Sequence, residues 1–462
     1  MRQPRLDTLP TDESGRVLDR LAGLDQVIPP EVFRQALQDA GHTDAPNCVL
    51  TGDIMLYLVL AMGLLTNLPI RQVFKHSRFA REQEDTPRRS TLCEARQRLG
   101  LEPFQHLFAL TVRPLATPDT PGAFYKEFRL MGCDGTVCDV PDSKANAAAF
   151  RRASGGRGDG AFPQIRKVSL VEIGTHVETA FVQGGWQDSE QALVEGLFEH
   201  IPQDALLLED RGFFSYAAWK KLLTRQVQLL VRVKNNMVFA PLRRLSDGSY
   251  LAKIYPSSYD RDQDRHGIEV RVIEYQLDDP QRVGHEEVHR LLTTLLDEAT
   301  YPAQELILLY HERWEEELTF DEQKTHQDPK RVTKPTNLRS QTPAGVRQEV
   351  YALSIAHFVV RALMFQAACQ EGLDTDRLSF LGCLHILQAR LPECRAQTPA
   401  TLTAWYRSLL WEMSREVIEP RRNRVNPRVI KRKMSKWKKK RPQHRGIPPL
   451  KKRFAETVVI TN

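Results

Sequence analysis

The chain has 462 residues, of which 41% are hydrophobic and 27% are charged, as in an ordinary water-soluble globular protein. This length exceeds one compact core, so we expect about three folded units. The first residues are mostly polar and the most apolar segment, Ile54–Leu65, is too short to cross a bilayer, so the composition argues against a signal peptide and a membrane span.

The cysteines give no sign of a metal or disulfide framework. They number seven and are scattered along the chain. Cys133 and Cys138 are close, but no second pair or nearby histidine completes a zinc pattern. We therefore expect reduced cysteines, as in a cytoplasmic protein.

Residues 1–116 predict a helical amino-terminal domain, because apolar residues recur there at helical spacing between capping and turn residues. One of its segments carries Arg96, Gln97 and Arg98 after a turn, a pattern typical of a DNA-reading helix. A packing helix with polar outer residues fits the same pattern. The expected helices are Glu31–Ala40, Thr51–Met62, Ile70–Phe74, Ser90–Leu99 and Phe104–Thr111.

After a linker at residues 117–122, residues 125–234 alternate between strands and helices in the order β-β-β-α-β-α-β. Two of the strands end in an aspartate close to a glycine, namely Asp134 in C-D-G-T and Asp210 in E-D-R-G. The strands are predicted at Phe128–Asp134, Lys167–Ile173, His176–Gln183, Ala205–Asp210 and Val227–Val233, and the helices at Asp188–His200 and Tyr216–Leu223.

A glycine-rich segment, Asn146–Phe162, follows the first of these strands. It lacks the features of a nucleotide-binding loop. We interpret it as a mobile loop whose arginines either touch DNA or lie on a plain surface. These arginines are Arg151, Arg152 and Arg157.

Residues 235–300 predict a mostly β insertion, since short strand-like runs alternate with D-G and D-R-D-Q-D-R turns. Arg232 and Lys234 at its entrance are candidate phosphate contacts. The predicted strands are Met237–Leu242, Tyr250–Tyr255, Ile268–Gln276 and His289–Leu295.

The run Y-H-E-R-W-E-E-E-L-T-F-D-E-Q-K contains Tyr310, Arg313, Glu317 and Lys324 at i, i+3, i+7 and i+14. On an α-helix these positions fall within roughly 60° of one another over about 21 Å. A carboxylate between cations suits a site where a metal ion meets a phosphate backbone. A solvated helix with i,i+4 ion pairs is the alternative.

The remaining segments are helical and then basic. Residues 301–370 contain this run and a long apolar helix, Gly345–Ala368, and residues 371–420 predict two more helices, Arg377–Arg390 and Pro399–Arg415. Residues 421–462 form a basic tail, in which Arg421–Arg453 holds 16 Lys and Arg and no acid, so the net +7 of the chain becomes −9 without it. Such a segment favours polyanions through counterion release. A solubilising disordered tail is the alternative.

Together, Y-x2-R-x3-E-x6-K, the D-G-T strand end and the D-R-G-F-F strand end resemble the IS-four family of bacterial insertion-sequence transposases over roughly residues 125–365. The resemblance implies an α/β fold: a ribonuclease-H-like core, split by the β insertion and preceded by the helical domain. In that fold the first and fourth strands are neighbours. The resemblance therefore implies that Asp134, Asp210 and Glu317 hold two Mg²⁺ ions, with Mn²⁺ as a substitute.

The implied activity is hydrolytic cleavage at transposon ends, followed by transfer of the 3′-hydroxyl ends into target DNA. Its partners would be double-stranded DNA, as terminal inverted repeats and target, and a second copy of the chain in a homodimer at the bacterial nucleoid in the cytoplasm. Tyr310, Arg313 and Lys324 would hold the DNA backbone, with Tyr310 and Lys324 exposed.

Three points stay open at this stage. Members of the family stack an aromatic of the insertion on a flipped base; this insertion has no tryptophan, and Phe239, Tyr250 and Tyr255 are unranked substitutes. A nuclease of the same fold without strand transfer, or a catalytically idle DNA-binding protein, are the alternative functions. The rival acids are Glu312, Glu315, Glu316 and Asp321 for Glu317, Asp139 and Asp142 for Asp134, and Glu209 for Asp210.

Overall fold

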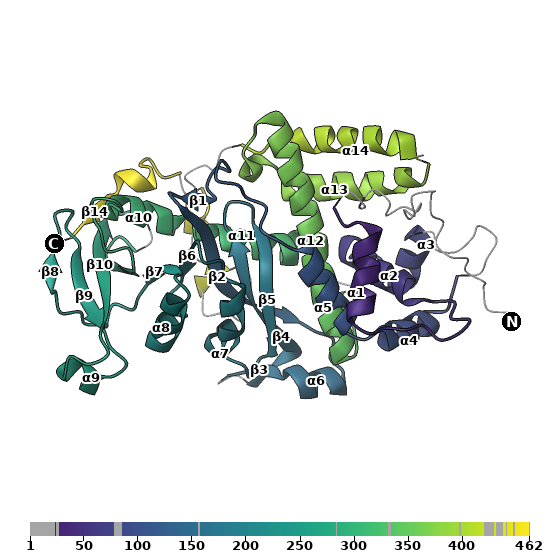
Figure 1. The fold of residues 1–462 in the computed structure, drawn as a ribbon, viewed down its shortest axis with the longest axis horizontal. Helices are drawn as coiled ribbons and strands as arrows, with labels where there is room; N and C mark the ends of the chain where they lie inside the picture. Colours follow the sequence, from purple (N-terminus) through teal and green to yellow (C-terminus); the bar gives the residue numbers. More distant parts are fainter. Residues whose placement is uncertain are drawn as a thin grey trace. The chain divides into compact units, whose positions relative to one another are not determined.

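The computed structural model divides the chain into two compact units, each described separately below (Figure 1). Unit 1 comprises residues 1–201 and 314–418, and unit 2 comprises residues 202–313 and 419–462. The structure describes residues 24, 27–77, 86–155, 158–282, 284–330, 334–396, 399–419, 429–430, 438–439, 441–446 and 449–461.

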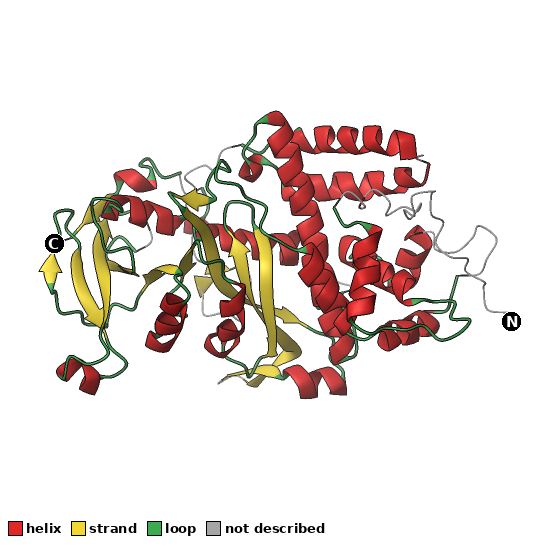
Figure 2. Ribbon diagram, in the orientation of Figure 1, coloured by secondary structure: helices red, strands yellow, loops and turns green. Residues whose placement is uncertain are grey.

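Unit 1 is built around a long helix, α12, which contacts α2, α5, α13, α14 and strand β5 (Figures 1 and 2). Thr342 caps its first turn by accepting from the Gly345 N–H at 3.3 Å, and Gly372 ends it with φ of 64°. The helices of this layer are α1 (Pro30–Asp39), α2 (Gly52–Leu64), α3 (Ile70–Ser77), α4 (Arg89–Leu99), α5 (Glu102–Thr111), α12 (Pro343–Glu371), α13 (Phe380–Arg390) and α14 (Pro399–Ser414). They confirm the expected helices.

Among the described residues, α12 alone is long and apolar enough to cross a membrane by length and composition. In the fold, 78% of its most apolar stretch is buried inside the protein. Its apolar character is therefore that of a core helix.

The sheet of unit 1 is antiparallel and has β4 at its centre. Strand β2 pairs with β4 so that Asp134 lies opposite Ser169, and β5 pairs with the other edge of β4. The strands are β1 (Phe124–Tyr125), β2 (Phe128–Asp139), β3 (Arg152–Gly155), β4 (Gly158–Glu172) and β5 (Val177–Gly185), with α6 (Lys144–Phe150), α7 (Glu190–Val194) and the 3-10 helix η2 (Glu195–His200) beside them.

Two expectations about this sheet are wrong. The described residues of the segment Asn146–Phe162 are not a loop, because they form the end of α6, strand β3 and the start of β4, whereas Arg157 lies outside the described residues. Strand β2 does not end at Asp134, because the β-branched Thr136 and Val137 continue the extended backbone to Asp139.

Unit 1 also contains the second half of the acidic run. Helix α11 (Trp314–Asp321) passes directly into a π-helix, η3 (Glu322–Gln327), and α11 lies against β2. Two short 3-10 helices complete the unit, η4 (Thr375–Arg377) and η5 (Leu391–Ala396).

Unit 2 begins with a parallel pair of strands, β6 and β7, joined through α8. The sheet continues antiparallel in the order β7-β11-β10-β9-β8. Its elements are β6 (Ala205–Glu209), α8 (Tyr216–Thr224), β7 (Gln228–Arg232), β8 (Arg243–Arg244), β9 (Tyr250–Ile254), α9 (Ser258–Asp262), β10 (Ile268–Leu277), β11 (His289–Thr293) and α10 (Ala303–His311).

The insertion departs from the sequence expectation at its first strand. Met237–Leu242 is not a strand, and only the short β8 follows it. Much of the basic tail, including residues 421–428 and 431–437, lies outside the described residues. Its described part contributes β14 (Val458–Ile460), which pairs with β10, and the short elements β12 (Val429–Ile430), β13 (Lys438–Lys439), η6 (Pro442–His444) and η7 (Phe454–Glu456).

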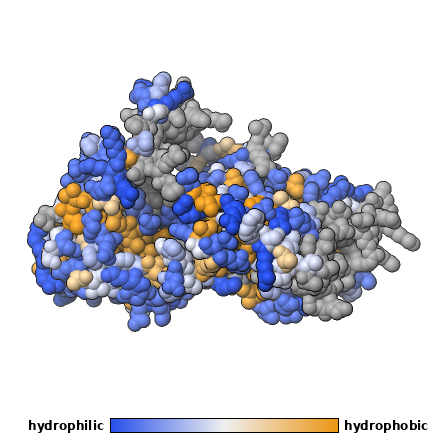
Figure 3. Space-filling view, turned by 90° about the horizontal axis from the view of Figure 1, so that it is seen from above, coloured by the Kyte–Doolittle hydropathy of each residue, from blue (hydrophilic) through white to orange (hydrophobic). Residues whose placement is uncertain are grey.

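The fold is thus mixed α/β, with sheets in both units and helices concentrated in unit 1. Figure 3 shows hydrophobic residues in patches among mostly hydrophilic ones on the face that it presents. The most exposed large hydrophobic side chain of the described residues is Val238, at 83%.

Candidate active site

Asp134 is held within a paired strand of unit 1. It is partly buried, and its Oδ1 accepts a hydrogen bond from the Gly135 N–H at 2.7 Å. Because residues on both sides of it are paired with β4, its backbone is fixed by the ladder. A rigid strand is a suitable support for a functional carboxylate.

Lys324 connects the acidic run to this strand. Its Nζ donates a hydrogen bond to Thr136 Oγ1 at 3.0 Å, two residues beyond Asp134. Lys324 lies in η3, and the preceding helix α11, which carries the exposed Glu317, packs against β2. Thr136 was not singled out in the sequence, and only its position in D-G-T marks it.

The Y-x2-R-x3-E-x6-K run is not one continuous helix, which corrects the expectation of a single face. Helix α10 ends before Arg313, α11 begins directly after it, and η3 follows α11. A π-helix is wound with i→i+5 hydrogen bonds, so its side chains do not follow the α-helical period. The regular α-helical spacing on which the expected stripe depends is therefore not kept along the run, and the division between the units falls between Arg313 and Trp314.

Asp210 lies in unit 2, directly after β6, as the sequence predicts. It is partly buried. The hydroxyl of Tyr310 donates to the backbone oxygen of Glu209 at 3.1 Å, so α10 is fastened to the end of the strand beside Asp210.

Tyr310 and Arg313 are buried, at 8% and 7% exposure, which corrects the expectation of an exposed tyrosine. Burial, aided by the negative charge of Asp210 and opposed by Arg313, raises the pKa of Tyr310 above its usual value. The guanidinium carbon of Arg313 lies 6.0 Å from the centre of the Tyr310 ring. Tyr310 is therefore a neutral hydrogen-bond donor at neutral pH.

The predicted phosphate contacts at the end of β7 differ in exposure. Lys234 is exposed. Arg232 is partly buried, and its guanidinium lies 3.7 Å from a carboxylate oxygen of Glu287. Arg232 is the last residue of β7, the strand that pairs with β6, and Lys234 follows two residues later within unit 2.

Several rival acids are engaged elsewhere. Asp139 accepts from Gln164 at 2.8 Å and pairs with Lys330, and Asp142 pairs with Arg152. Glu209 is buried, and burial raises its pKa to about 8, so it is protonated at neutral pH.

The rivals close to Glu317 lie in different surroundings. Glu315 is buried and its carboxylate lies 3.0 Å from His176 Nε2. Asp321 is exposed and lies 3.4 Å from His326. Glu312 is exposed and precedes α11, and the Glu316 side chain lies outside the described part of the chain.

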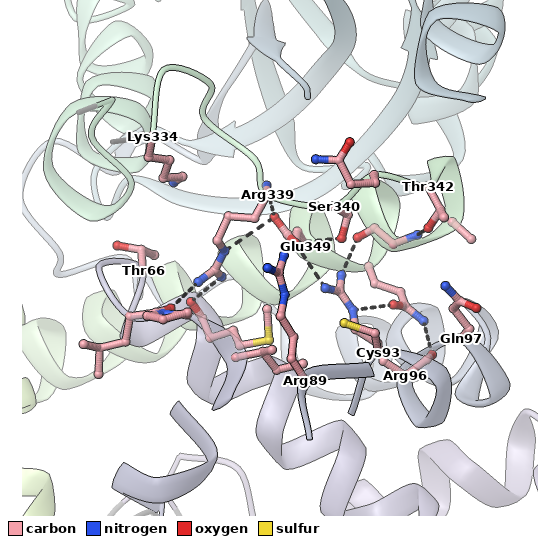
Figure 4. Close-up of a pocket in the computed structure, with 18 of the residues that line it drawn as sticks. Thr66, Arg89, Cys93, Arg96, Gln97, Lys334, Arg339, Ser340, Thr342 and Glu349 are labelled. Carbon is pink, nitrogen blue, oxygen red and sulfur yellow. Dashed lines mark hydrogen bonds and ion pairs between the residues drawn. The ribbon is translucent and has the colours of Figure 1, made fainter. Parts of the chain in front are cut away.

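A separate cavity of about 790 Å³ opens in unit 1 between α4, the α2–α3 turn and the start of α12 (Figure 4). Glu349 lies at the wall of this cavity between Arg96 and Arg339. Its Oε1 lies 3.1 Å from Nη1 of Arg96, and its Oε2 accepts a hydrogen bond from the backbone N–H of Arg339 at 2.7 Å. The predicted triad does not line this cavity.

The wall of this cavity shows that Arg96 of α4 has a packing role, one of the two interpretations that the sequence leaves open for this helix. Arg96 is buried at 7% exposure and donates to Gln348 at 2.7 Å and to the backbone oxygen of Gly345. It fastens α4 to α12. Gln97 and Arg98 remain exposed.

The sequence analysis missed a buried polar cluster in unit 1. It contains His176, Glu315, Glu322, His357, Arg361 and Asp376. Glu322 begins η3 and accepts from Arg361 Nε and His357 Nε2 of α12, each at 2.9 Å. No motif marks these residues, because they lie far apart in the chain.

Comparison with known proteins adds two family matches. Residues 18–109 match the family described as "Insertion element 4 transposase N-terminal", and residues 133–359 match "Transposase DDE domain".

Individual relatives agree with these matches. The chain is 27% identical to the transposase InsG for insertion sequence element IS4 of Escherichia coli (strain K12), over 90% of this chain and 93% of that protein. It is 23% identical to the putative transposase InsZ of the same organism, over 44% of this chain and 73% of that protein. Among solved structures, a piggyBac transposase synaptic complex with hairpin DNA aligns over 88% of each chain at 13% identity, with a TM-score of 0.43.

Proposed function

The chain belongs to the IS-four family of insertion-sequence transposases, and from that premise we propose that Asp134, Asp210 and Glu317 form its active site for cut-and-paste transposition. As a DNA transposase it is an enzyme that cleaves and joins DNA strands. We further propose a ribonuclease-H-like arrangement of the core, in which these three carboxylates converge.

The hydrogen bond from Lys324 to Thr136 is the observation that carries this proposal furthest. It fastens the segment that bears Glu317 to the strand that bears Asp134, within one unit. In the other unit, the bond from Tyr310 to Glu209 fixes the end of α10 beside Asp210. The rival acids that are buried or paired support the same choice of residues.

The donor set fits the divalent metal ions on which this class of transposase depends. Carboxylate oxygens are the ligands that Mg²⁺ prefers, and we propose two Mg²⁺ ions held by Asp134, Asp210 and Glu317, with Mn²⁺ as a substitute. Such ions, when bound, lower the pKa of a water and stabilise charge on a phosphoryl group.

In the first step, water attacks the phosphorus at the transposon end, and the bond from phosphorus to the 3′-oxygen breaks. The released oxygen takes a proton and becomes a 3′-hydroxyl. In the second step this hydroxyl attacks a phosphodiester of the target, a new phosphorus–oxygen bond forms, and the displaced 3′-oxygen of the target takes the proton.

The cations of the chain would orient the DNA for these steps. Lys324, held by Thr136, places an ammonium next to the strand of Asp134. Arg232, the last residue of β7, and Lys234, two residues further on, offer phosphate contacts. Because Tyr310 and Arg313 are buried, we assign them the role of holding α10 in place, in addition to any contact with DNA.

The partners that follow are double-stranded DNA, as transposon terminal inverted repeats and as target, and a second copy of the chain in a homodimer assembled on paired ends. The proposed location is the nucleoid in the bacterial cytoplasm.

The test uses purified protein, DNA with terminal inverted repeats, a target plasmid and Mg²⁺. Asp134→Asn, Asp210→Asn and Glu317→Gln should each abolish cleavage and leave end binding within about twofold. Asp142→Asn, which removes an exposed carboxylate paired with Arg152, is the matched control and should retain cleavage.

Each other outcome has a definite meaning. Cleavage by the wild type without joined products favours a nuclease, and end binding without cleavage favours an idle DNA-binding protein. Cleavage by any one of the three carboxylate variants removes that residue from the site.

A further inference from the structure

Three side chains from distant parts of unit 1 meet in its interior. They are His176, in the turn between β4 and β5; Glu315, in the first turn of α11; and Asp376, in η4. One oxygen of each acid and a ring nitrogen of the histidine lie within 4.8 Å of one another. His176 and Glu315 are buried at 2% and 6% exposure.

The distances match those between the ligand atoms of a metal ion. His176 Nε2 lies 3.0 Å from Glu315 Oε2 and 3.3 Å from Asp376 Oδ1. With metal–ligand bonds of about 2.0–2.2 Å, the donors of a tetrahedral zinc site are roughly 3.3 Å apart. Imidazole with two carboxylates is a ligand set that Zn²⁺ accepts.

The single hydrogen on His176 Nε2 is donated to only one of the two carboxylates that face this nitrogen, whereas a cation would bind both. Nε2 carries one hydrogen, which Glu315 accepts at 3.0 Å. Asp376 Oδ1 is buried, faces the same nitrogen and has no hydrogen-bond partner in the described structure. A cation bound to Nε2 would be shared by both carboxylates.

The other ring nitrogen has the partner that such a histidine needs. A metal-binding histidine donates its second N–H to a carboxylate, which fixes the orientation of the ring. Nδ1 of His176 lies 3.2 Å from Glu322 Oε1 and also contacts Nη2 of Arg361, which donates to it in the metal-free form. In the bound form the ring hydrogen moves to Nδ1 and is accepted by Glu322 Oε1. Arg361 then gives up its contact with Nδ1 and keeps its bonds to Glu322, from Nη2 to Oε1 and from Nε to Oε2 at 2.9 Å.

The charges of the cluster agree with a divalent ion. Glu315, Glu322 and Asp376 bring three carboxylates, and Arg361 is the guanidinium that pairs with Glu322. A divalent cation on Nε2 would face Glu315 and Asp376, the two carboxylates that lie against this nitrogen, and would replace the ring proton there.

We propose that His176, Glu315 and Asp376 bind one Zn²⁺ ion, separate from the proposed catalytic ions. The ion joins the β4–β5 turn, the first turn of α11 and η4. Because Glu315 lies two residues before Glu317, the zinc orders the helix that bears the proposed catalytic glutamate.

The test uses the full chain carrying Asp134→Asn, Asp210→Asn and Glu317→Gln, so that the proposed catalytic site contributes nothing. After EDTA treatment and dialysis, titration with zinc chloride should show one Zn²⁺ per chain by calorimetry and by elemental analysis. The melting temperature should rise with Zn²⁺ and not with Mg²⁺. Because this protein is inactive by design, failure here is distinguishable from failure of the proposed function.

Added to this background, Asp376→Asn should weaken zinc binding at least tenfold, and His176→Ala should abolish it. His385→Ala, which removes an exposed histidine of α13, is the matched control and should bind as the background does. If His176→Ala does not fold, Asp376→Asn decides, because its side chain is 27% exposed and keeps its shape. No zinc uptake, or uptake unchanged by Asp376→Asn, would overturn the proposal.

Discussion

The hydroxyl of Tyr310 donates a hydrogen bond to the backbone oxygen of Glu209, with the two oxygens 3.1 Å apart. Both residues are buried, so this bond fastens α10 to β6 in a place that water does not reach. Tyr310 therefore has a structural role, which is to hold α10 against β6.

Tyr310→Phe should lower the free energy of unfolding by about 1–2 kcal/mol, because a buried carbonyl loses its donor. Chemical denaturation followed by circular dichroism measures the change. Tyr259→Phe, at a side chain 66% exposed, is the control and should change stability by less than about 0.5 kcal/mol. Equal stability of Tyr310→Phe and wild type would mean that the bond contributes nothing.

Thr136→Val should reduce cleavage about tenfold and leave folding unchanged. Valine keeps the shape of threonine, but it removes the acceptor of the Lys324 ammonium. Thr136→Ser keeps the hydroxyl and should restore most of the rate. Single-turnover cleavage of a DNA end measures both variants, and a Thr136→Val enzyme as fast as wild type would show that Lys324 needs no such support.

Arg96→Ala should destabilise the protein by about 3–5 kcal/mol, because it leaves the buried Glu349 without one of its cations. Gln97→Ala, at the exposed neighbour, is the control and should stay within about 0.5 kcal/mol of wild type. Urea denaturation measures both. Unchanged stability with weaker DNA binding in Arg96→Ala would instead support a DNA-reading role for α4.

We predict that Asp328 makes the free energy of unfolding fall as the pH rises. Burial raises its pKa from 3.8 to about 6, although Lys334 pulls it down. The folded protein therefore binds the Asp328 proton more tightly than the unfolded chain does. The stabilisation that this protonated carboxyl contributes is full below about pH 4 and is lost as the pH rises to about 6. Two pKa units correspond to about 3 kcal/mol at most.

The comparison with Asp328→Asn isolates this effect. The difference in unfolding free energy between the variant and wild type should change between pH 4 and pH 6 in favour of the variant, and stay constant from pH 7 to pH 8. A difference that does not vary with pH would show that Asp328 titrates normally in the folded protein.

Local signals were sufficient for most elements. Helices α1–α5 follow from apolar periodicity and from Pro and Gly at their ends, and the strand before Asp210 follows from its apolar run. The sequence predicts too early an end for β2, because Gly135 indicates the end of a strand, whereas pairing with β4 continues to Asp139.

Tertiary contacts decided what the sequence could not predict. The π-helix η3 starts at Glu322, which is held by Arg361 and His357 of α12 far along the chain. No local pattern in Tyr310–Lys324 shows this, so a regular helix was the natural expectation. The convergence of Asp134, Asp210 and Glu317 stays a prediction that rests on the family.

The pairing of β14 with β10 has a consequence for biosynthesis. Ile460 lies opposite Tyr275, so the sheet of unit 2 gains this strand only after the ribosome has produced all of α11 to α14. Until then, Tyr275–Leu277 of β10 have no strand on the edge where β9 pairs with Ile268–Val272, while the later helices of unit 1 emerge. A nascent chain stalled after Ile418 would offer that edge to other strands, and aggregation of such intermediates is the hazard that this chain order creates.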